Sequence, residues 1–361
     1  MLGKEFIKMN NKEECLVSIF CITYNHKNYI KKCLDGFVMQ KTNFKFEAIV
    51  YDDCSTDGTR EIVQEYADKY PDIIKTIFPH KNIAQSEGYY KINTLMYENM
   101  EGKYYAYCEG DDYWCDEHKL QKQVDFLENN PDYSICFHPA CVKYEGFGYN
   151  KPDELYPNNI TPKEVTFENL LMQNYIPTSS VVYRWRFHNE NFQDWFPKNI
   201  FAGDWQLNLL HASVGKIKML TDVMSVFRKQ PKGINSCFNG NIEDLYLVHG
   251  LKMLNQYENI YEKITNHSEY FLNNKYIPEL STIIETYLKN RKFEDLKTIA
   301  DLYPQKYDIA IEKMINAHIS FLEKTNRKLE KRKMYYKTLS IFISSIALFE
   351  FILLLYLVVI K

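Results

Sequence analysis

The sequence of 361 residues predicts an α/β protein with a mostly parallel β-sheet flanked by helices, followed by a helical C-terminal region. The first observation behind this fold class is the alternation of short apolar runs with segments of helical periodicity. The second is a change at about residue 241, where long helical segments with few Gly begin. We therefore expect an α/β domain at 1–240, a helical region at 241–337 and a transmembrane helix at 338–360.

The composition is that of a folded globular protein, with 45% hydrophobic and 25% charged residues. The net charge of −3 argues against a nucleic-acid partner, and so does the lack of a long basic run interleaved with aromatic residues before the C-terminus. The nine Cys form no Cys-x-x-Cys pair, which indicates reduced thiols rather than a disulfide framework or a zinc site. The first 14 residues are polar and charged, so we expect no secretory signal.

The first strand is expected at 16–23, a continuous apolar run of the kind that is buried in a parallel sheet. Residues 29–40 place apolar side chains at helical spacing and follow as the first helix. The loop between them, 24–28, contains no Gly, so the glycine-rich phosphate loop of dinucleotide-binding proteins is missing. This loop therefore argues against a dinucleotide-dependent oxidoreductase.

The second strand, 46–51, ends at the acidic pair Asp52 and Asp53. Ser, Thr and Asp at 55–57 are candidate N-caps for a helix at 59–70. Asp53 has two interpretations here, a carboxylate that binds a ligand or a residue that stabilises the turn. The elements expected next are a strand at 73–78 and a helix at 86–100.

Residues 104–114 form the stretch around which the chain is organised. A strand of aromatic and small apolar residues ends in Glu109, a glycine, Asp111 and Asp112. Open α/β sheets bind ligands at the C-terminal edge, and neighbouring carboxylates at that edge suit Mg²⁺ or Mn²⁺. A solvated acidic turn is the alternative that these residues alone leave open.

The second half of the α/β domain continues the alternation of strands and helices. Asp204 stands at the start of its last expected helix, where it could be a helix cap or a functional carboxylate. A loop rich in Gly, Pro and Asn is expected at 145–162. The strands are expected at 133–144, 178–185 and 216–227, and the helices at 119–129, 166–173 and 204–214.

Residues 338–360 are apolar apart from a few hydroxyl groups and Glu350. Such a run is long enough to cross a hydrocarbon core of ~30 Å, although a buried or interfacial helix has the same composition. Seven basic residues precede the run, so the positive-inside rule places residues 1–337 in the cytoplasm of a bacterium, with a single C-terminal anchor in the inner membrane. The helices at 241–332 could cover the acceptor, form a homo-oligomer interface or act as a spacer. The seven basic residues that precede the apolar run at 338–360 are Lys324, Arg327, Lys328, Lys331, Arg332, Lys333 and Lys337.

Four motifs in order resemble those of the family 2 inverting glycosyltransferases. Residues 17–25 are similar to that family's opening strand, and 48–59 to its second strand with the ending Asp-Asp-x-Ser-x-Asp-Gly-Thr. Residues 109–114, Glu-Gly-Asp-Asp-Tyr-Trp, resemble its metal motif, and 203–205, Gly-Asp-Trp, the late motif with the catalytic base. The resemblance covers 16–236 and implies a GT-A fold, the Rossmann-like fold of nucleotide-diphospho-sugar transferases.

The resemblance implies transfer of a sugar from a nucleotide-diphosphate sugar, with inversion, supported by Mn²⁺ or Mg²⁺. It assigns the metal ion to Asp112 and the role of catalytic base to Asp204, whose carboxylate would take the proton of the acceptor hydroxyl. A single displacement of this kind requires no second carboxylate as nucleophile. By the same resemblance, the nucleotide would contact Thr23, Tyr24, Asn25, Asp53 and Asp111.

Two positions depart from the family pattern after the expected base. The family often continues with an aromatic-Arg-x-His stretch and a later Gly-x-Trp-Ser, and here Gln230 stands where His would be and Asn235 where Trp would be. Arg228 is kept, and it could bind the diphosphate or be a plain surface arginine. Residues 178–180 could contact the donor or acceptor sugar, or form a polar strand end.

The sequence thus predicts a glycosyltransferase that extends a surface polysaccharide or a lipid-linked oligosaccharide, with the C-terminal helix holding it beside a lipid-linked acceptor. The alternative is a non-catalytic relative that binds a nucleotide-sugar or scaffolds an assembly complex. Intact carboxylates at Asp112 and Asp204 favour the enzyme.

Overall fold

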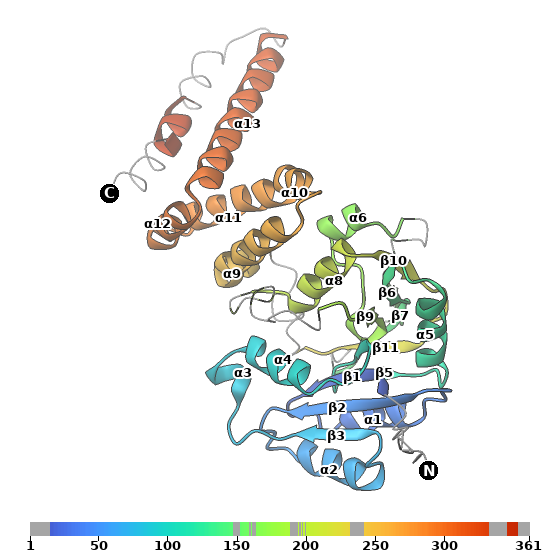
Figure 1. Ribbon diagram of the computed structural model, residues 1–361. Helices are drawn as coiled ribbons and strands as arrows, with labels where there is room; N and C mark the ends of the chain where they lie inside the picture. Colours follow the sequence, from blue (N-terminus) through green and yellow to red (C-terminus); the bar gives the residue numbers. More distant parts are fainter. Residues whose placement is uncertain are drawn as a thin grey trace, which may run out of the picture. The chain divides into compact units, whose positions relative to one another are not determined.

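The structure, a computed structural model, divides into two compact units, Met1–Cys237 and Phe238–Lys361. The described part of the first unit contains two β-sheets, and the described part of the second is helical (Figure 1). The residues described are 15–146, 152–158, 160, 164–187, 194, 196, 198, 200–231, 242–331 and 345–352.

The strands of the main sheet are β1 (Cys15–Thr23), β2 (Lys45–Asp52), β3 (Ile74–Ile77), β4 (Tyr104–Tyr107), β6 (Tyr133–Phe137), β9 (Val182–Arg184) and β10 (Lys216–Met219). Over the described residues they lie in the order β10-β6-β9-β4-β1-β2-β3. All neighbours pair in parallel except β9, which runs antiparallel to both β4 and β6. The α/β sheet that the alternation predicts is therefore confirmed, with one antiparallel strand inside it.

The helices of the first unit that the structure describes cover both faces of this sheet. They are α1 (Ile30–Val38), α2 (Thr59–Lys69), α3 (Ile83–Ser86), α4 (Tyr89–Glu98), α5 (Lys119–Asn129), α6 (Phe167–Met172), the 3₁₀ turn η1 (Thr178–Ser180) and α8 (Gly203–Ser213). The single helix expected at 86–100 is divided into α3 and α4. Gly88 separates them with a φ of 88°, which an α-helix cannot continue through.

The two faces of the main sheet carry different cores, because successive residues of a strand point to opposite sides. Along β1, Val17, Ile19 and Cys21 join a cluster of mainly aliphatic and sulfur-containing side chains that includes α1 and α5. Phe20 points to the other face, where aromatic rings pack against one another. The rings of this layer include Tyr97, Tyr105, Tyr183, Trp185 and His211. This layer contains several of the 29 tyrosines of the chain.

A second sheet joins segments that the sequence pattern does not connect. Its strands are β5 (Tyr113–Trp114), β7 (Ala140–Tyr144), β8 (Glu154–Tyr156) and β11 (Ser225–Lys229), in the order β5-β11-β7-β8 over the described residues. The strand expected at 133–144 is divided between the two sheets, because Pro139 has no N–H to continue the ladder. The run at 216–227 is likewise divided, into β10 and β11. The second sheet thereby brings β11 beside the residues that follow β4.

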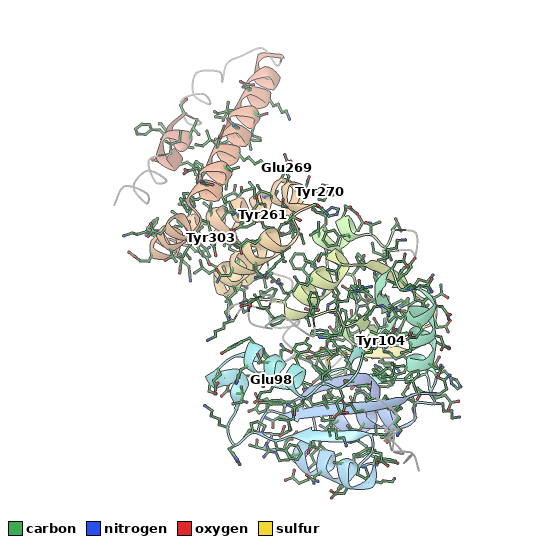
Figure 2. The ribbon with its side chains drawn as sticks, in the orientation of Figure 1. Glu98, Tyr104, Tyr261, Glu269, Tyr270 and Tyr303 are labelled. Carbon is green, nitrogen blue, oxygen red and sulfur yellow. The ribbon has the colours of Figure 1, made fainter. Side chains whose placement is uncertain are left out.

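The described helices of the second unit are α9 (Ile242–Lys263), α10 (Ser268–Phe271), the π-helical turn η3 (Leu272–Tyr276), α11 (Ile277–Lys289), α12 (Phe293–Leu302) and α13 (Pro304–Lys331). Lys306 forms an ion pair of 2.9 Å with Glu258 and lies 4.7 Å from the ring centre of Tyr261. The hydroxyl of Tyr303 donates to the side chain of Asn255. Tyr261 and Tyr303, labelled in Figure 2, thus mark the place where α9 contacts the beginning of α13.

The structure contradicts the transmembrane helix predicted at 338–360. In the part of the chain that is described, no helix is both long and apolar enough to cross a membrane. Residues 345–352 are helical. The ring of Phe351 stacks on His318 of α13 with centroids 6.2 Å apart, so this apolar segment contacts another helix. The rest of 338–360 lies outside the described residues, and the cellular location stays a prediction.

Candidate active site

The acidic turn, residues 109–112, follows β4 directly at the C-terminal edge of the main sheet. The backbone N–H of Gly110 donates to the carbonyl of Ile22 over 3.0 Å, which fixes the turn against the end of β1. A Cβ atom on Gly110 would lie 2.6 Å from Oγ1 of Thr23, closer than such atoms approach. Glycine at this position therefore lets the turn and the end of β1 pack in direct contact.

Asp111 and Asp112 are neighbours in the sequence but have opposite environments. The side chain of Asp111 is 25% exposed, whereas Asp112 is 1% exposed and its Oδ1 accepts a hydrogen bond of 2.8 Å from the backbone N–H of Arg228. Burial, and then the charge of Asp111, raises the pKa of Asp112 well above its usual range. Asp111 therefore presents its carboxylate outward, and Asp112 presents its carboxylate to the protein backbone.

Two side chains flank the carboxylate of Asp111. Nε2 of Gln230 donates to Oδ2 of Asp111 over 3.3 Å, and Nε2 of His26 lies 4.0 Å from the same oxygen. Gln230, which stands where the family pattern often has His, thus contacts the acidic turn.

Arg228 is buried, and its guanidinium contacts several other residues. It is 7% exposed, and its Nε donates to Oε1 of Glu145 over 3.0 Å. The guanidinium lies over the rings of Tyr113 and Tyr29, at 4.4 and 5.3 Å from their centres, and also donates to the carbonyl of Asp111. These contacts hold β11 against the acidic turn. The predicted contact of Arg228 with a diphosphate stays a prediction.

Asp204 lies in the first turn of α8, where the helix dipole favours a negative charge. The N-cap of this helix is Ala202, so Asp204 is not the cap residue. Oδ2 of Asp204 accepts from Nδ2 of Asn174 over 2.9 Å and from Oγ1 of Thr178 over 3.4 Å. Burial raises the pKa of Asp204, and hydrogen bonds from the backbone of Trp205 and from these two side chains oppose the shift. The carboxylate is thus half-buried and held by several donors.

Glu109 connects Asp204 to the acidic turn. Its pKa is raised to about 8 by burial and then by the negative charges of Asp111 and Asp204. Glu109 therefore lies close enough to be repelled by both Asp111 and Asp204, although Asp204 comes from a helix far along the chain. One site contains both the predicted base and the predicted metal motif.

The donor set of this site fits a divalent cation. Mutual repulsion of Glu109 and Asp111 is the electrostatic condition that a bound cation relieves. Within the described residues, no three His, Cys, Asp or Glu side chains gather closely enough to hold a metal by themselves. Magnesium-type ions often use only one or two carboxylates and complete their shell with water and substrate phosphates. The turn thus suits an ion that arrives with a phosphate ligand.

The residues predicted to contact the nucleotide differ in their exposure and in the hydrogen bonds that their side chains already make. Oγ1 of Thr23 is buried and makes no hydrogen bond within the described part of the chain, and the ring of Tyr24 is 40% exposed. Asn25, at a φ of 55°, instead uses its Oδ1 to accept from the backbone N–H of Thr56 over 2.9 Å. The ring of Tyr24 is therefore open to a ligand, the hydroxyl of Thr23 is buried at the end of β1, and the side chain of Asn25 joins two loops.

The carboxylate of Asp53 is occupied by backbone donors. It is 2% exposed, and its oxygens accept from the N–H groups of Ile83 at 2.7 Å and Ala84 at 3.0 Å. The hydroxyl of Tyr51 donates to the same carboxylate over 3.2 Å. Asp53 thus stabilises the beginning of α3 instead of the turn that follows it, and its contact with a nucleotide stays a prediction.

Several side chains that contact the predicted site residues were not among the predicted ones, and they include His26, Glu145 and Asn174. His26 lies in the loop after β1, so its place beside other residues of that loop was the available signal. Glu145 and Asn174 belong to segments with no recognisable motif. Their contacts depend on how distant parts of the chain fold together, and no local pattern indicates them.

Residues 18–189 match the sequence model of the family described as Glycosyl transferase family 2. An uncharacterized protein of Mycobacterium tuberculosis is 39% identical over 218 residues, which cover 60% of this chain and 60% of that protein. The putative teichuronic acid biosynthesis glycosyltransferase TuaG of Bacillus subtilis is 34% identical over 112 residues, covering 31% of this chain and 42% of that protein. The chain therefore spans less than two thirds of the length of these relatives.

Among solved structures, TarS 1–349 of Staphylococcus aureus in complex with UDP-GlcNAc is similar at 19% identity and a TM-score of 0.47, covering 84% of this chain and 92% of that chain. A similarity of this degree does not by itself establish a common fold. Asp204 and Arg228 lie beyond the residues that the family model matches, whereas the whole acidic turn lies within them. Residues 18–189 therefore form a glycosyl transferase family 2 domain, the family that the sequence motifs predict.

Proposed function

We propose that the chain is an inverting glycosyltransferase that moves a sugar from a nucleotide-diphosphate sugar to a hydroxyl of a glycan or lipid-linked acceptor. The feature that supports this most is the place of Asp204 near the acidic turn, where its charge adds to burial and to the charge of Asp111 in raising the pKa of Glu109. A base on one side and a cation-binding edge on the other are the two requirements of a single displacement at a sugar. The family 2 domain supports the reaction class.

Asp204 is the proposed base. Asp204 is partly exposed at the beginning of α8, and its carboxylate is the kind of group that takes a proton from an attacking hydroxyl. The hydrogen bonds from Asn174 and Thr178 favour its ionised form, which is the form a base must have. No second carboxylate is needed as a nucleophile, because the hydroxyl attacks the sugar directly.

Asp111 is the proposed cation ligand, in place of Asp112. The prediction from the motif assigns the ion to Asp112, but that carboxylate is buried and bonded to the backbone of Arg228. Asp111 is the more exposed of the pair and is aligned by Gln230. When bound, the cation would neutralise the charge that develops on the leaving diphosphate.

The nucleoside is proposed to lie against the end of β1. The exposed ring of Tyr24 offers a surface on which a base can stack, and Oγ1 of Thr23 offers a buried polar atom. The close contact of Gly110 with Thr23 brings the acidic turn to the same place. A nucleotide-sugar held there would direct its diphosphate toward Asp111.

A panel of nucleotide-sugars, screened for thermal stabilisation with and without Mn²⁺, tests the proposed donor class. A ligand that binds only the native state raises the apparent stability, so one class of nucleotide-sugar should raise the melting temperature, and more so with Mn²⁺. Asp111→Asn should lose the Mn²⁺-dependent part. Asp222→Asn, a surface control whose carboxylate pairs with Lys122, should keep it. Absence of stabilisation by every nucleotide-sugar would contradict the proposal.

A further inference from the structure

A chain of hydrogen bonds runs from the interior of the first unit to the carboxylate of Asp204. The hydroxyl of Tyr183 donates to Oδ1 of Asn208 over 2.6 Å. Nδ2 of Asn208 donates to Oδ1 of Asn174 over 3.0 Å, and Nδ2 of Asn174 donates to Oδ2 of Asp204 over 2.9 Å. Four side chains from three separate segments, the one at Asn174, β9 and α8, therefore form one connected path.

The direction of this path follows from the chemistry of its members. An ionised carboxylate can only accept, so Asn174 must turn its amide nitrogen toward Asp204. Its oxygen then faces Asn208, and the backbone N–H of Ile176, which can only donate, points to the same oxygen over 3.4 Å. Asn208 must in turn offer its nitrogen to Asn174 and its oxygen to Tyr183. Every hydrogen in the path is thus directed toward the carboxylate, an arrangement in which the bonds polarise one another.

The far end of the path is anchored in the core. Asn208 on α8 is 1% exposed and Tyr183 on β9 is 2% exposed, and the Tyr183 ring stacks on Tyr105 with centroids 5.3 Å apart. The hydroxyl of Tyr156 on β8 donates to the backbone carbonyl of Asn174 and fixes that residue from another side. The amide of Asn174 is therefore held by packed groups, while Asp204 at the near end is half-buried.

We propose that Asn174 is a positioning residue that holds Asp204 ionised and correctly oriented, through the path that begins at Tyr183. This inference rests on the proposed function only in naming Asp204 a base. The donors favour the charged form of the carboxylate and offset its burial. The titratable groups that respond to the charge of Asp204 are Glu109 on the acidic turn, Tyr156 on β8 and Tyr183 itself.

The ionisation of Asp204 can be measured without any substrate. In the full chain labelled with ¹³C at the aspartate carboxyl carbons, the signal that Asp204→Asn removes identifies Asp204, and a pH titration gives its pKa. Asn174→Ala should raise that pKa by about one to two units, the equivalent of one charge-assisted hydrogen bond. Tyr183→Phe, which deletes one oxygen atom, should raise it by a smaller amount. Tyr175→Phe is the matched control, because that buried hydroxyl donates to the carbonyl of Thr166 instead.

In each variant the acid limb of the pH profile of kcat/KM should move to higher pH by that variant's own shift in the pKa of Asp204, and therefore further in Asn174→Ala than in Tyr183→Phe. An unchanged pKa of Asp204 in both variants, each still folded, would overturn the role of Asn174 even if Asp204→Asn abolishes transfer. The proposed function fails on a different result, namely full transfer by Asp204→Asn. The titration and the transfer assay therefore separate the two claims.

Discussion

The backbone N–H of Arg228 donates a hydrogen bond of 2.8 Å to Oδ1 of Asp112 and so joins β11 to the acidic turn. The two residues lie 116 positions apart in the sequence. The bond explains why Asp112 is buried while the adjacent Asp111 is partly exposed. Asp112 therefore stabilises the turn, whereas the carboxylate of Asp111 can contact a ligand.

Asp112→Ala should lower the free energy of unfolding by ~1–3 kcal/mol, because the buried N–H of Arg228 loses its acceptor. Asp112→Asn keeps an acceptor oxygen and should cost less. Metal-dependent binding of a nucleoside diphosphate should disappear in Asp111→Asn and persist in Asp112→Asn, as calorimetry with and without Mn²⁺ can measure. The reverse pattern would return the ion to Asp112, as the motif alone predicts.

Arg228→Lys should lower the melting temperature and weaken nucleotide binding, because an ammonium cannot contact both Glu145 and the carbonyl of Asp111 as the guanidinium does. Glu145→Gln should act in the same direction but less strongly. Urea denaturation and calorimetry give the two quantities. If Arg228 instead serves the diphosphate, Glu145→Gln frees the guanidinium, and tighter nucleotide binding by that variant would refute the structural role.

Gly110→Ala should destabilise the protein by about 1–3 kcal/mol, because the added methyl group overlaps Oγ1 of Thr23 and displaces the acidic turn. Nucleotide affinity should fall together with stability, since the turn and the end of β1 form the proposed pocket. Thermal unfolding and calorimetry on the same variant check both effects. Unchanged values of both would show that the turn is not packed against β1 as described.

Lys119 should make the stability of the parent rise with pH above neutrality. Burial lowers its pKa to about 7, with Nζ bonded to Gln123 at 2.8 Å, whereas an unfolded lysine titrates near ~10.4. Between these values the unfolded chain binds more protons, so this residue adds up to ~1.4 kcal/mol per pH unit to the free energy of unfolding. Urea unfolding at about pH 7.5 and 9.5 should show this gain relative to Lys119→Met.

The surface variant Lys122→Met serves as the control for that comparison, since Lys122 pairs with Asp116 and Asp222 and is 40% exposed. It should keep the slope of the parent between the two pH values. Equal slopes in Lys119→Met and the parent would mean that Lys119 does not lie neutral in the core.

Periodicity was sufficient to predict the sheet and most of its helices, because burial on one face of an element repeats at the period of that element. The helix expected at 119–129, for example, has the bounds of α5. Local patterns could not show that Pro139 divides one apolar run between two sheets, since strand pairing is a long-range property. Nor could the length of the apolar run at 338–360 distinguish a membrane-spanning helix from a segment that contacts α13.

The site was predictable to the extent that its residues share short motifs. The acidic turn and Asp204 can be recognised in the sequence. Which of Asp111 and Asp112 can bind a cation, however, depends on the hydrogen bond from Arg228, which belongs to the second sheet. Asn174 has no motif, and its function follows only from the path of side chains behind it.

Transfer by Asp204→Asn tests the proposed base most directly. The purified parent and the variant are compared for donor binding by calorimetry and for release of the nucleoside diphosphate in the presence of acceptor and Mn²⁺. The variant should bind the donor as the parent does and transfer ~10²–10⁴-fold more slowly, the usual contribution of a general base. Transfer within a few-fold of the parent would contradict the assignment of Asp204 as the base.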